Sequence, residues 1–278
     1  MLIKSYAKIN LSLRVLKKLK SGLHDIETNF FVINLFDEIK LKRIHGIKDK
    51  IKFKGKFHKF INKNNNSITN TLITLRKMGF CKARYEIIVE KNIPVFAGLG
   101  GGTSNAFFLA KNLFTKKMDE NLIQKLENKI GSDFRIFLFK QGFLKNLKRT
   151  QRYKRKFKLY LLIIFPNIQC STKFIYSKIK KMSKPRGVNY SSISKTADLI
   201  KALKKDKNDL QKIVEKKYRS IEKIISFLDD QKDCYFSRMT GSGSACFGLF
   251  KTEKTAKVTH KKIKKMFPNY WTAVSRTI

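Results

Sequence analysis

The stretch that decides the fold is Pro94-Val95-Phe96-Ala97-Gly98-Leu99-Gly100-Gly101-Gly102-Thr103-Ser104. It follows a strand-like run, Tyr85–Glu90, and opens into a helical run from Asn105 to Lys117. Four glycines within five positions can present several backbone N–H groups at the start of that helix, where the helix dipole also favours negative charge. The stretch therefore predicts a phosphate-binding loop.

The spacing of these glycines excludes the commonest phosphate loops. A P-loop requires a lysine directly after its last glycine, and the dinucleotide pattern G-x-G-x-x-G fails because Thr103 stands where its third glycine should be. The His-Arg-Asp and Asp-Phe-Gly motifs of protein kinases do not occur. A flexible glycine-rich turn is the alternative. Against it, Ala106, Leu109 and Leu113 recur at helical spacing, which predicts a packed helix after the loop.

The bulk composition is that of a folded globular protein. With 278 residues and 42% hydrophobic content, the chain is long enough for two domains of ordinary size. We find neither an apolar run of the roughly 18–20 residues that span a bilayer nor a secretory signal pattern. The scattered cysteines Cys81, Cys170, Cys234 and Cys246 predict reduced thiols, no zinc site and a cytoplasmic location.

The net charge is extreme, with 62 Lys+Arg against 20 Asp+Glu, or +42. Such an excess ordinarily indicates a nucleic acid or another anionic partner. Because the lysines are spread along the whole chain, we favour compositional drift with a benefit for anionic substrates. Lys145 to Lys158, in which Tyr153 and Phe157 lie between basic residues, is the best candidate for a nucleic-acid contact and also for a linker between domains.

The glycine stretch and the residues after it, Asn105-Ala106, resemble the central motif of the GHMP small-molecule kinases. Two further segments resemble the other motifs of that family in the same order, Ala7-Lys8-Ile9-Asn10-Leu11 and Met239-Thr240-Gly241-Ser242-Gly243-Ser244. The resemblance implies an α+β, two-domain fold. Its N-terminal lobe would be ribosomal-protein-S5-domain-2-like and its C-terminal lobe ferredoxin-like, with the active site in the cleft between them. We predict the domains at residues 1–155 and 156–278.

The resemblance implies catalytic roles for Lys8 and Asp133. Lys8 matches the lysine at the reacting hydroxyl, and Asp133, after Gly131-Ser132, matches the catalytic base. The structural alternatives are an exposed lysine on a half-buried strand, Tyr6–Val15, and a helix N-cap at Asp133. Within about 4 Å of Asp133, Lys8 would keep that carboxylate ionised. Arg135 replaces a proline of the family, and we expect it to loosen this turn.

A binding site for a cytidine group is the second implication. His24 matches a histidine that recognises cytosine, Thr172 and Tyr176 match residues that contact the cytidine, and Asn10 matches an asparagine beside the substrate. Leu23 replaces a stacking tyrosine of the family. A plain surface histidine is the alternative for His24, and core packing is the alternative for Tyr176.

ATP and Mg²⁺ are the cofactors that the resemblance implies. ATP is expected on Pro94 to Ser104, with Asn70 near the base and the third glycine motif, Thr240 to Gly243, closing against the loop. The Ser104 hydroxyl is a candidate Mg²⁺ ligand. We name no carboxylate ligand, because the acidic Gly-x-Gly-Glu turn of the family is missing.

These observations predict an ATP-dependent alcohol kinase. This version of the glycine motif resembles the branch that phosphorylates the 2-hydroxyl of 4-diphosphocytidyl-2-C-methyl-D-erythritol in non-mevalonate isoprenoid precursor biosynthesis. A GHMP kinase for homoserine, mevalonate or a sugar is the alternative within the family. A basic nucleic-acid-binding protein on the same scaffold is the alternative outside it. We expect a monomer or weak dimer with no membrane partner.

Overall fold

The computed structural model describes residues 1–114, 118–147 and 149–278. The chain forms two compact units, each assembled from separate segments. The first unit contains Met1–Lys8, Leu35–Val95 and Gly100–Phe139, and the second contains Ile9–Asn34, Phe96–Leu99 and Lys140–Ile278. The long strands β1 (Leu2–Lys18) and β2 (His24–Ile44) contribute residues to both units. A single domain boundary between residues 155 and 156 therefore remains a prediction.

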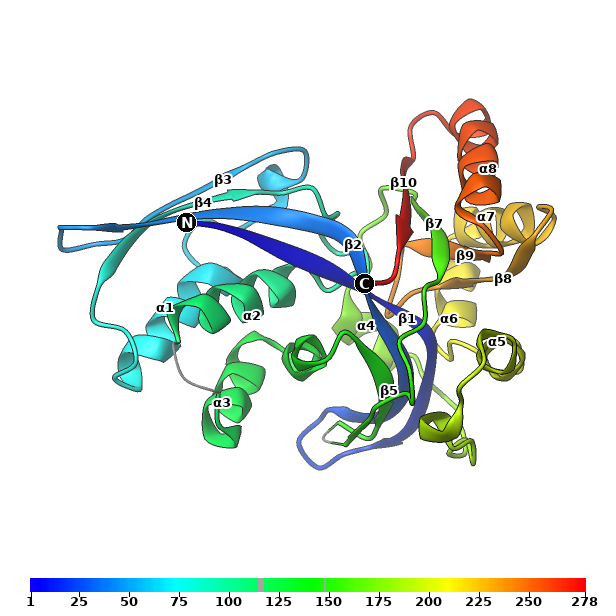
Figure 1. Ribbon diagram of the computed structural model, residues 1–278, viewed down its shortest axis with the longest axis horizontal. Helices are drawn as coiled ribbons and strands as arrows, with labels where there is room; N and C mark the ends of the chain where they lie inside the picture. Colours follow the sequence, from blue (N-terminus) through cyan, green and yellow to red (C-terminus); the bar gives the residue numbers. More distant parts are fainter. Residues whose placement is uncertain (115–117, 148) are drawn as a thin grey trace. The chain divides into compact units, whose positions relative to one another are not determined.

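The first unit is a sheet covered by helices on one face (Figure 1). Strand β4 (Arg84–Glu90) pairs in parallel with β3 (Lys50–Lys54) and antiparallel with the second half of β2. Helices α1 (Ser67–Lys77) and α2 (Gly101–Leu113) pack on this sheet because their apolar stripes meet the inward side chains of β2 and β4 in one core cluster. The remaining elements of this unit are η1 (His58–Phe60), α3 (Glu120–Ile130) and η2 (Ser132–Leu138).

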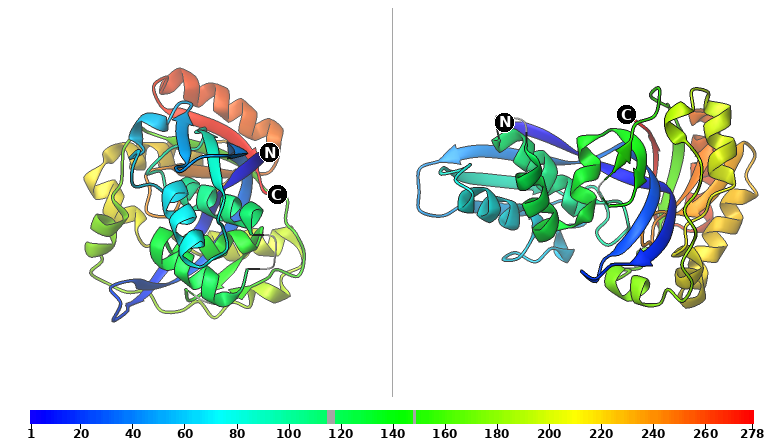
Figure 2. Two further views of the ribbon diagram at one scale, coloured as in Figure 1. Left: turned by 90° about the vertical axis from the view of Figure 1, so that its left-hand side faces the viewer. Right: turned by 90° about the horizontal axis from the view of Figure 1, so that it is seen from below.

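The second unit contains a four-stranded antiparallel sheet in the order β10-β7-β9-β8, with helices α7 and α8 on the same face (Figure 2). Together β7, α7, β8, β9, α8 and β10 follow the β-α-β-β-α-β order of ferredoxin-like folds, as predicted. The first half of β2 pairs with β5, and β5 pairs with β6, so these strands belong to the same six-stranded sheet, in the order β3-β4-β2-β5-β6 with β1 also paired to β2. The bounds are β5 (Gln141–Lys145), β6 (Thr150–Gln151), β7 (Tyr160–Phe165), α4 (Thr172–Ser177), η3 (Tyr190–Ser192), α5 (Thr196–Lys204), α6 (Gln211–Lys217), α7 (Arg219–Asp229), β8 (Cys234–Met239), β9 (Cys246–Phe250), α8 (Glu253–Met266) and β10 (Trp271–Arg276).

The helix after the glycine loop begins earlier than predicted. Helix α2 begins at Gly101 rather than Asn105, so two of the loop glycines form its first turn, and the predicted end at Lys117 lies outside the described residues. Helix α4 ends at Ser177. The chain leaves the helix there, and Ser183 N donates to the Val15 carbonyl oxygen at 2.8 Å.

The basic segment from Lys145 to Lys158 is not a linker, and its described residues belong to the fold. It begins in β5 and contains β6. Tyr153 and Phe157 are both buried, and the Tyr153 hydroxyl donates to Asn29 Oδ1 at 2.6 Å. These two aromatic rings are core residues, so they are not free to stack on nucleic-acid bases. The predicted nucleic-acid contact depended on that stacking.

All four cysteines are free thiols. Within the described ranges no helix has both the length and the apolar character to cross a membrane.

Candidate active site

Lys8 and Asp133 form an ion pair in the first unit. Lys8 Nζ lies 3.0 Å from Asp133 Oδ2, and the lysine side chain is 4% exposed whereas that of the aspartate is 33% exposed. The polar face of β1 is thus buried rather than solvated, and the structural alternative of an exposed strand lysine is wrong. Gly100 leaves room for the Lys8 side chain, because a Cβ at position 100 would lie only 2.9 Å from Lys8 Cγ. The result is an accessible carboxylate beside a buried ammonium.

Asp133 lies in the first turn of the 3-10 helix η2, whose N-cap is Gly131, so the N-cap alternative is wrong. Arg135 does not loosen this turn. Its guanidinium bonds Glu120 and Glu127 at 2.5–3.1 Å, which ties η2 to α3. These bonds raise the pKa of Arg135, with the bond to Glu120 as the largest cause, so the arginine stays charged.

The N-terminus of α2 is open to an anion. Its N-cap, Gly100, has φ +69 and no side-chain cap, and the first intrahelical bond comes from Ser104 N to Gly100 O. The backbone N–H groups before Ser104 have no carbonyl partner within the helix. Gly102 leaves space beside them, since a Cβ there would be no closer than 3.8 Å to its nearest neighbour, Ser67 Oγ. These residues fit the phosphate groups of a nucleotide.

Ser104 does not fit as a direct Mg²⁺ ligand. The residue is fully buried, because this position in the first turn of α2 faces β1. Its hydroxyl donates to the Tyr6 carbonyl oxygen at 2.6 Å and lies 2.7 Å from Ser5 Oγ. The described residues also contain no group of three or more His, Cys, Asp or Glu side chains that could hold a metal ion. We therefore assign no metal ligand to this chain.

In the second unit the two glycine stretches touch each other. A Cβ on Gly98, which has φ +76, would lie 2.3 Å from the Thr240 carbonyl oxygen, and Ala245 N donates to Ala97 O at 3.1 Å. Asn10 N donates to Thr240 Oγ1 at 2.9 Å. The predicted approach of the third glycine motif to the loop is therefore present.

Sequence reasoning missed the residue that holds this turn. The buried Asn208 donates from Nδ2 to the carbonyl oxygens of Met239 and Gly241, at 2.7 and 2.8 Å. A single asparagine in a lysine-rich connection carries no local signal for such a role.

The residues predicted to bind cytidine come together in pairs. The rings of His24 and Tyr176 lie 5.0 Å apart between centroids, inclined at 36°. Thr172 Oγ1 lies 2.9 Å from Ser242 Oγ of the third glycine motif. Burial, and then the charge of Lys18, lower the pKa of His24, so its imidazole is neutral at pH 7 with one donor and one acceptor nitrogen. Leu23 is exposed beside it.

Three other predicted residues have mixed surroundings. Asn10 is buried, and its Nδ2 donates to Thr28 Oγ1 at 2.8 Å. Asn70 is half-buried in α1 and donates to Asn65 Oδ1 at 3.0 Å. Phe96 has φ +59 and is 51% exposed, whereas Pro94, Ala97 and Leu99 of the same loop are buried.

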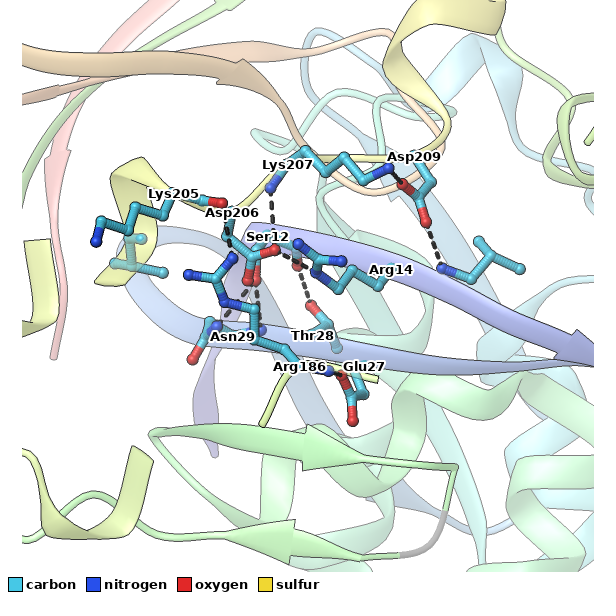
Figure 3. Close-up of polar contacts among 12 residues, drawn as sticks. Ser12, Arg14, Glu27, Thr28, Asn29, Arg186, Lys205, Asp206, Lys207 and Asp209 are labelled. Atoms are coloured by element: carbon cyan, nitrogen blue, oxygen red, sulfur yellow. Dashed lines mark hydrogen bonds and ion pairs between the residues drawn. The ribbon is translucent and has the colours of Figure 1, made fainter. Parts of the chain in front are cut away.

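A polar cluster, also missed, fastens the chain after α4 to β1 and β2 (Figure 3). Arg186 N donates to Glu27 Oε2 at 2.7 Å, and Arg14 Nε donates to Asp206 Oδ1 at 2.6 Å. Asp209 Oδ2 accepts from Val15 N at 2.8 Å. The strand end that carries His24 and the segment that follows Tyr176 are thereby joined.

Comparison with known proteins gives concordant results. Residues 66–140 match the family described as GHMP kinases N terminal domain, and residues 191–269 match GHMP kinases C terminal. A 4-diphosphocytidyl-2-C-methyl-D-erythritol kinase from Pelagibacter ubique (strain HTCC1062) is 37% identical, over 99% of this chain and 98% of that protein. The protein of the same name from Wolbachia sp. subsp. Drosophila simulans (strain wRi) is 31% identical over the same shares.

Among solved structures, a 4-(cytidine 5'-diphospho)-2C-methyl-D-erythritol kinase has a TM-score of 0.74 at 21% identity and covers all of both chains. The Methanococcus jannaschii mevalonate kinase has a TM-score of 0.64 at 18% identity, over 100% of this chain and 98% of that one. At these identities the structural matches support the two-domain α+β fold.

Proposed function

The chain belongs to the GHMP kinase family, and from this we propose that it transfers the γ-phosphoryl group of ATP to the 2-hydroxyl of 4-diphosphocytidyl-2-C-methyl-D-erythritol. The observation that carries the proposal is the pair of Lys8 and Asp133, 3.0 Å apart with the carboxylate accessible. Two full-length relatives, 37% and 31% identical, bear the name of this kinase.

In the proposed reaction the substrate hydroxyl oxygen forms a bond to the γ-phosphorus, and the bond from that phosphorus to the bridging oxygen breaks to release ADP. Asp133 accepts the hydroxyl proton, and Lys8 stabilises the carboxylate before transfer. Phosphoryl transfer depends on positioning and electrostatic stabilisation more than on covalent catalysis. A carboxylate held 3.0 Å from a buried lysine meets the first requirement, positioning.

We assign the ATP phosphates to the free N–H groups at the start of α2, where the helix dipole favours them. Mg²⁺ enters the proposal only as a part of the nucleotide substrate, bound through its phosphates. Ser104 is excluded as its ligand because the hydroxyl already bonds Tyr6 and Ser5.

The cytidine group is assigned to His24 and Tyr176. The neutral imidazole can exchange one donated and one accepted hydrogen bond with a pyrimidine edge, and the tyrosine ring beside it offers an aromatic face. Thr172 and Asn10 are the remaining assigned contacts. Asn10 keeps its orientation through Thr28 and Thr240.

The alternatives are less well supported. Matches to mevalonate and homoserine kinases lie at 13–18% identity, which supports a shared fold only. The nucleic-acid alternative loses the two aromatic rings on which it depended, because Tyr153 and Phe157 are buried.

The test is ADP release by the purified protein with Mg²⁺ and ATP, with and without the cytidine substrate. We expect substrate-dependent turnover, and we expect Asp133→Asn to lower kcat by about 10²–10⁴-fold, the usual contribution of a general base. Glu253→Gln is the matched control, since it removes the charge of an exposed carboxylate on α8. No turnover in the folded parent protein, or an Asp133→Asn variant as active as Glu253→Gln, would overturn the proposal.

A further inference from the structure

The first unit contains a buried ion pair that lies outside the proposed chemistry. Asp37 of β2 and Lys91, directly after β4, are 0% and 2% exposed, and the Lys91 ammonium donates to Asp37 Oδ2. Asn105 of α2 completes the group, because its Oδ1 accepts from Lys91 Nζ at 2.9 Å and its Nδ2 donates to Asp37 Oδ2 at 3.0 Å. We call Asp37, Lys91 and Asn105 the loop brace.

Burial on this scale is costly. Removing two charges from water carries a desolvation penalty that good geometry only offsets, and well-packed apolar side chains often do as well or better for stability. All three side chains are too deep to touch a substrate. The brace therefore calls for an explanation other than direct binding.

One end of the brace fixes the entry to the glycine loop. Asp37 Oδ1 accepts from the backbone N–H groups of Asn92 and Ile93, at 2.7 and 2.8 Å. These two residues immediately precede Pro94, where the loop begins. Ile93 in turn packs so close to Gly101 that a Cβ there would lie 3.0 Å from Ile93 Cγ2.

The other end fixes the first turns of α2 against β1. Asn105 Nδ2 donates to Ser5 Oγ at 2.9 Å, and Ser5 Oγ lies 2.7 Å from Ser104 Oγ. Ser104 donates to the Tyr6 carbonyl oxygen, two residues before Lys8. One continuous set of buried bonds thus connects the residues before the loop, the helix after it and the strand that carries Lys8.

We propose that Asp37, Lys91 and Asn105 are positioning residues for the nucleotide: they hold the first turn of α2 so that its free N–H groups face the phosphates at a fixed distance from Lys8. This inference rests on the proposed function, because it takes the start of α2 as the phosphate site. It predicts that loosening the brace weakens nucleotide binding more than it weakens the fold.

The same unit provides a matched control. Asp49 bonds Arg76 at 2.7 and 2.8 Å, and Asp49 Oδ1 accepts from Tyr85 N at 2.8 Å. Asp49 therefore fastens the start of β4, whereas Asp37 fastens the residues that follow the end of β4. This pair is also largely buried, with side chains 12% and 20% exposed. Among the residues that the structure describes, none of the hydrogen-bond partners of this pair belongs to the glycine loop or to α2.

The experiment compares Asp37→Asn/Lys91→Met with Asp49→Asn/Arg76→Met in the full chain. Each double variant removes both charges, so neither leaves a lone buried ion. We measure melting temperature, ADP dissociation constant by calorimetry, and KM for ATP and for the cytidine substrate. We expect similar falls in melting temperature, but an ADP affinity about 10- to 100-fold weaker in the first variant alone, as small misplacements of a binding group produce. Its KM for the cytidine substrate should stay unchanged.

Equal ADP affinity in the two double variants would overturn the proposal. Asn105→Leu, which keeps the ion pair and removes the bonds from α2, is the substitute if the first variant does not fold, and it should also weaken ADP binding. Failure of the proposed function is distinguishable, because a parent protein that binds ADP but does not phosphorylate the cytidine substrate refutes the reaction and leaves the brace testable. A parent that binds no ADP refutes both.

Discussion

At the scale of single residues, the glycines of the loop have separate reasons to be glycine. Gly98 and Gly100 both have positive φ and pack against Thr240 and Lys8, respectively. Gly102 has neither constraint, because the space beside its Cα is open. Gly98 and Gly100 must therefore be glycine because of the protein's own backbone and packing. Gly102 has no such reason, and a ligand beside it would supply one.

This difference yields a paired prediction for Gly102→Ala and Gly98→Ala. Gly102→Ala should change stability by no more than about 0.5 kcal/mol, as for an exposed site. If the added methyl group removes one hydrogen bond to a charged phosphate, worth about 1.5–3 kcal/mol, the affinity for ATP should fall at least about tenfold. Gly98→Ala should lose about 2 kcal/mol or more of stability, from left-handed strain and overlap with Thr240 O.

Chemical denaturation and ADP calorimetry on the two variants measure these effects. The control is Gly46→Ala, since a Cβ at Gly46 meets no atom within 4 Å. Unchanged ADP affinity in Gly102→Ala would place the phosphates elsewhere.

At the scale of elements, the segment after α4 depends on a buried carboxylate. Glu27 of β2 accepts the Arg186 N–H, and burial raises the pKa of Glu27 despite that bond and the charge of Arg14. A raised pKa means that the folded protein favours the protonated acid. The stability that protonated Glu27 contributes is fully present below the pKa of Glu27 in the unfolded chain, near 4.5. It is lost as pH rises through the pKa of Glu27 in the folded protein.

Glu27→Gln should therefore gain stability relative to the parent as pH rises from about 4.5 to 7. The amide oxygen can still accept from Arg186 N, while no charge is buried. Melting temperatures of both proteins across this pH range measure the difference, with Glu253→Gln as the control for a surface carboxylate. A variant that loses stability relative to the parent at pH 7 would mean that the ionised form is the favoured partner of Arg14.

The elements also show where sequence reasoning succeeds. Local pattern predicted the strand-like run Tyr85–Glu90, the strand Tyr6–Val15 and the helix after the glycine loop, because each has its own period or turn chemistry. It did not predict that the polar face of β1 is buried. The partners of that face, such as Thr240 for Asn10 and Asp133 for Lys8, lie more than a hundred residues away. The brace was missed for the same reason, since Asp37 and Lys91 each resemble an ordinary strand-end charge.

At the scale of the whole molecule, the charge of +42 is a source of self-repulsion. The described ion pairs involve few of the 62 basic residues. Screening by salt acts on exposed charges beyond about 10 Å at 0.1 M. We therefore expect the melting temperature to rise when sodium chloride is raised from 0.05 to 0.5 M, and to rise likewise in potassium acetate.

Thermal melts in the two salts make the measurement. A melting temperature that rises in only one of the two salts would indicate a bound anion rather than screening. A melting temperature that does not change with salt would contradict the idea that the net charge affects stability.

The strand order of the ferredoxin-like sheet has a consequence for biosynthesis. The register places Phe165 of β7 opposite Trp271 of β10, so the ribosome makes the two partners far apart in time. Until β10 emerges, the apolar β7 presents an unpaired edge that invites aggregation. The residues of the first unit all precede residue 140. The nascent chain can therefore complete α2 and the loop brace before the last strand of the four-stranded sheet has been synthesised.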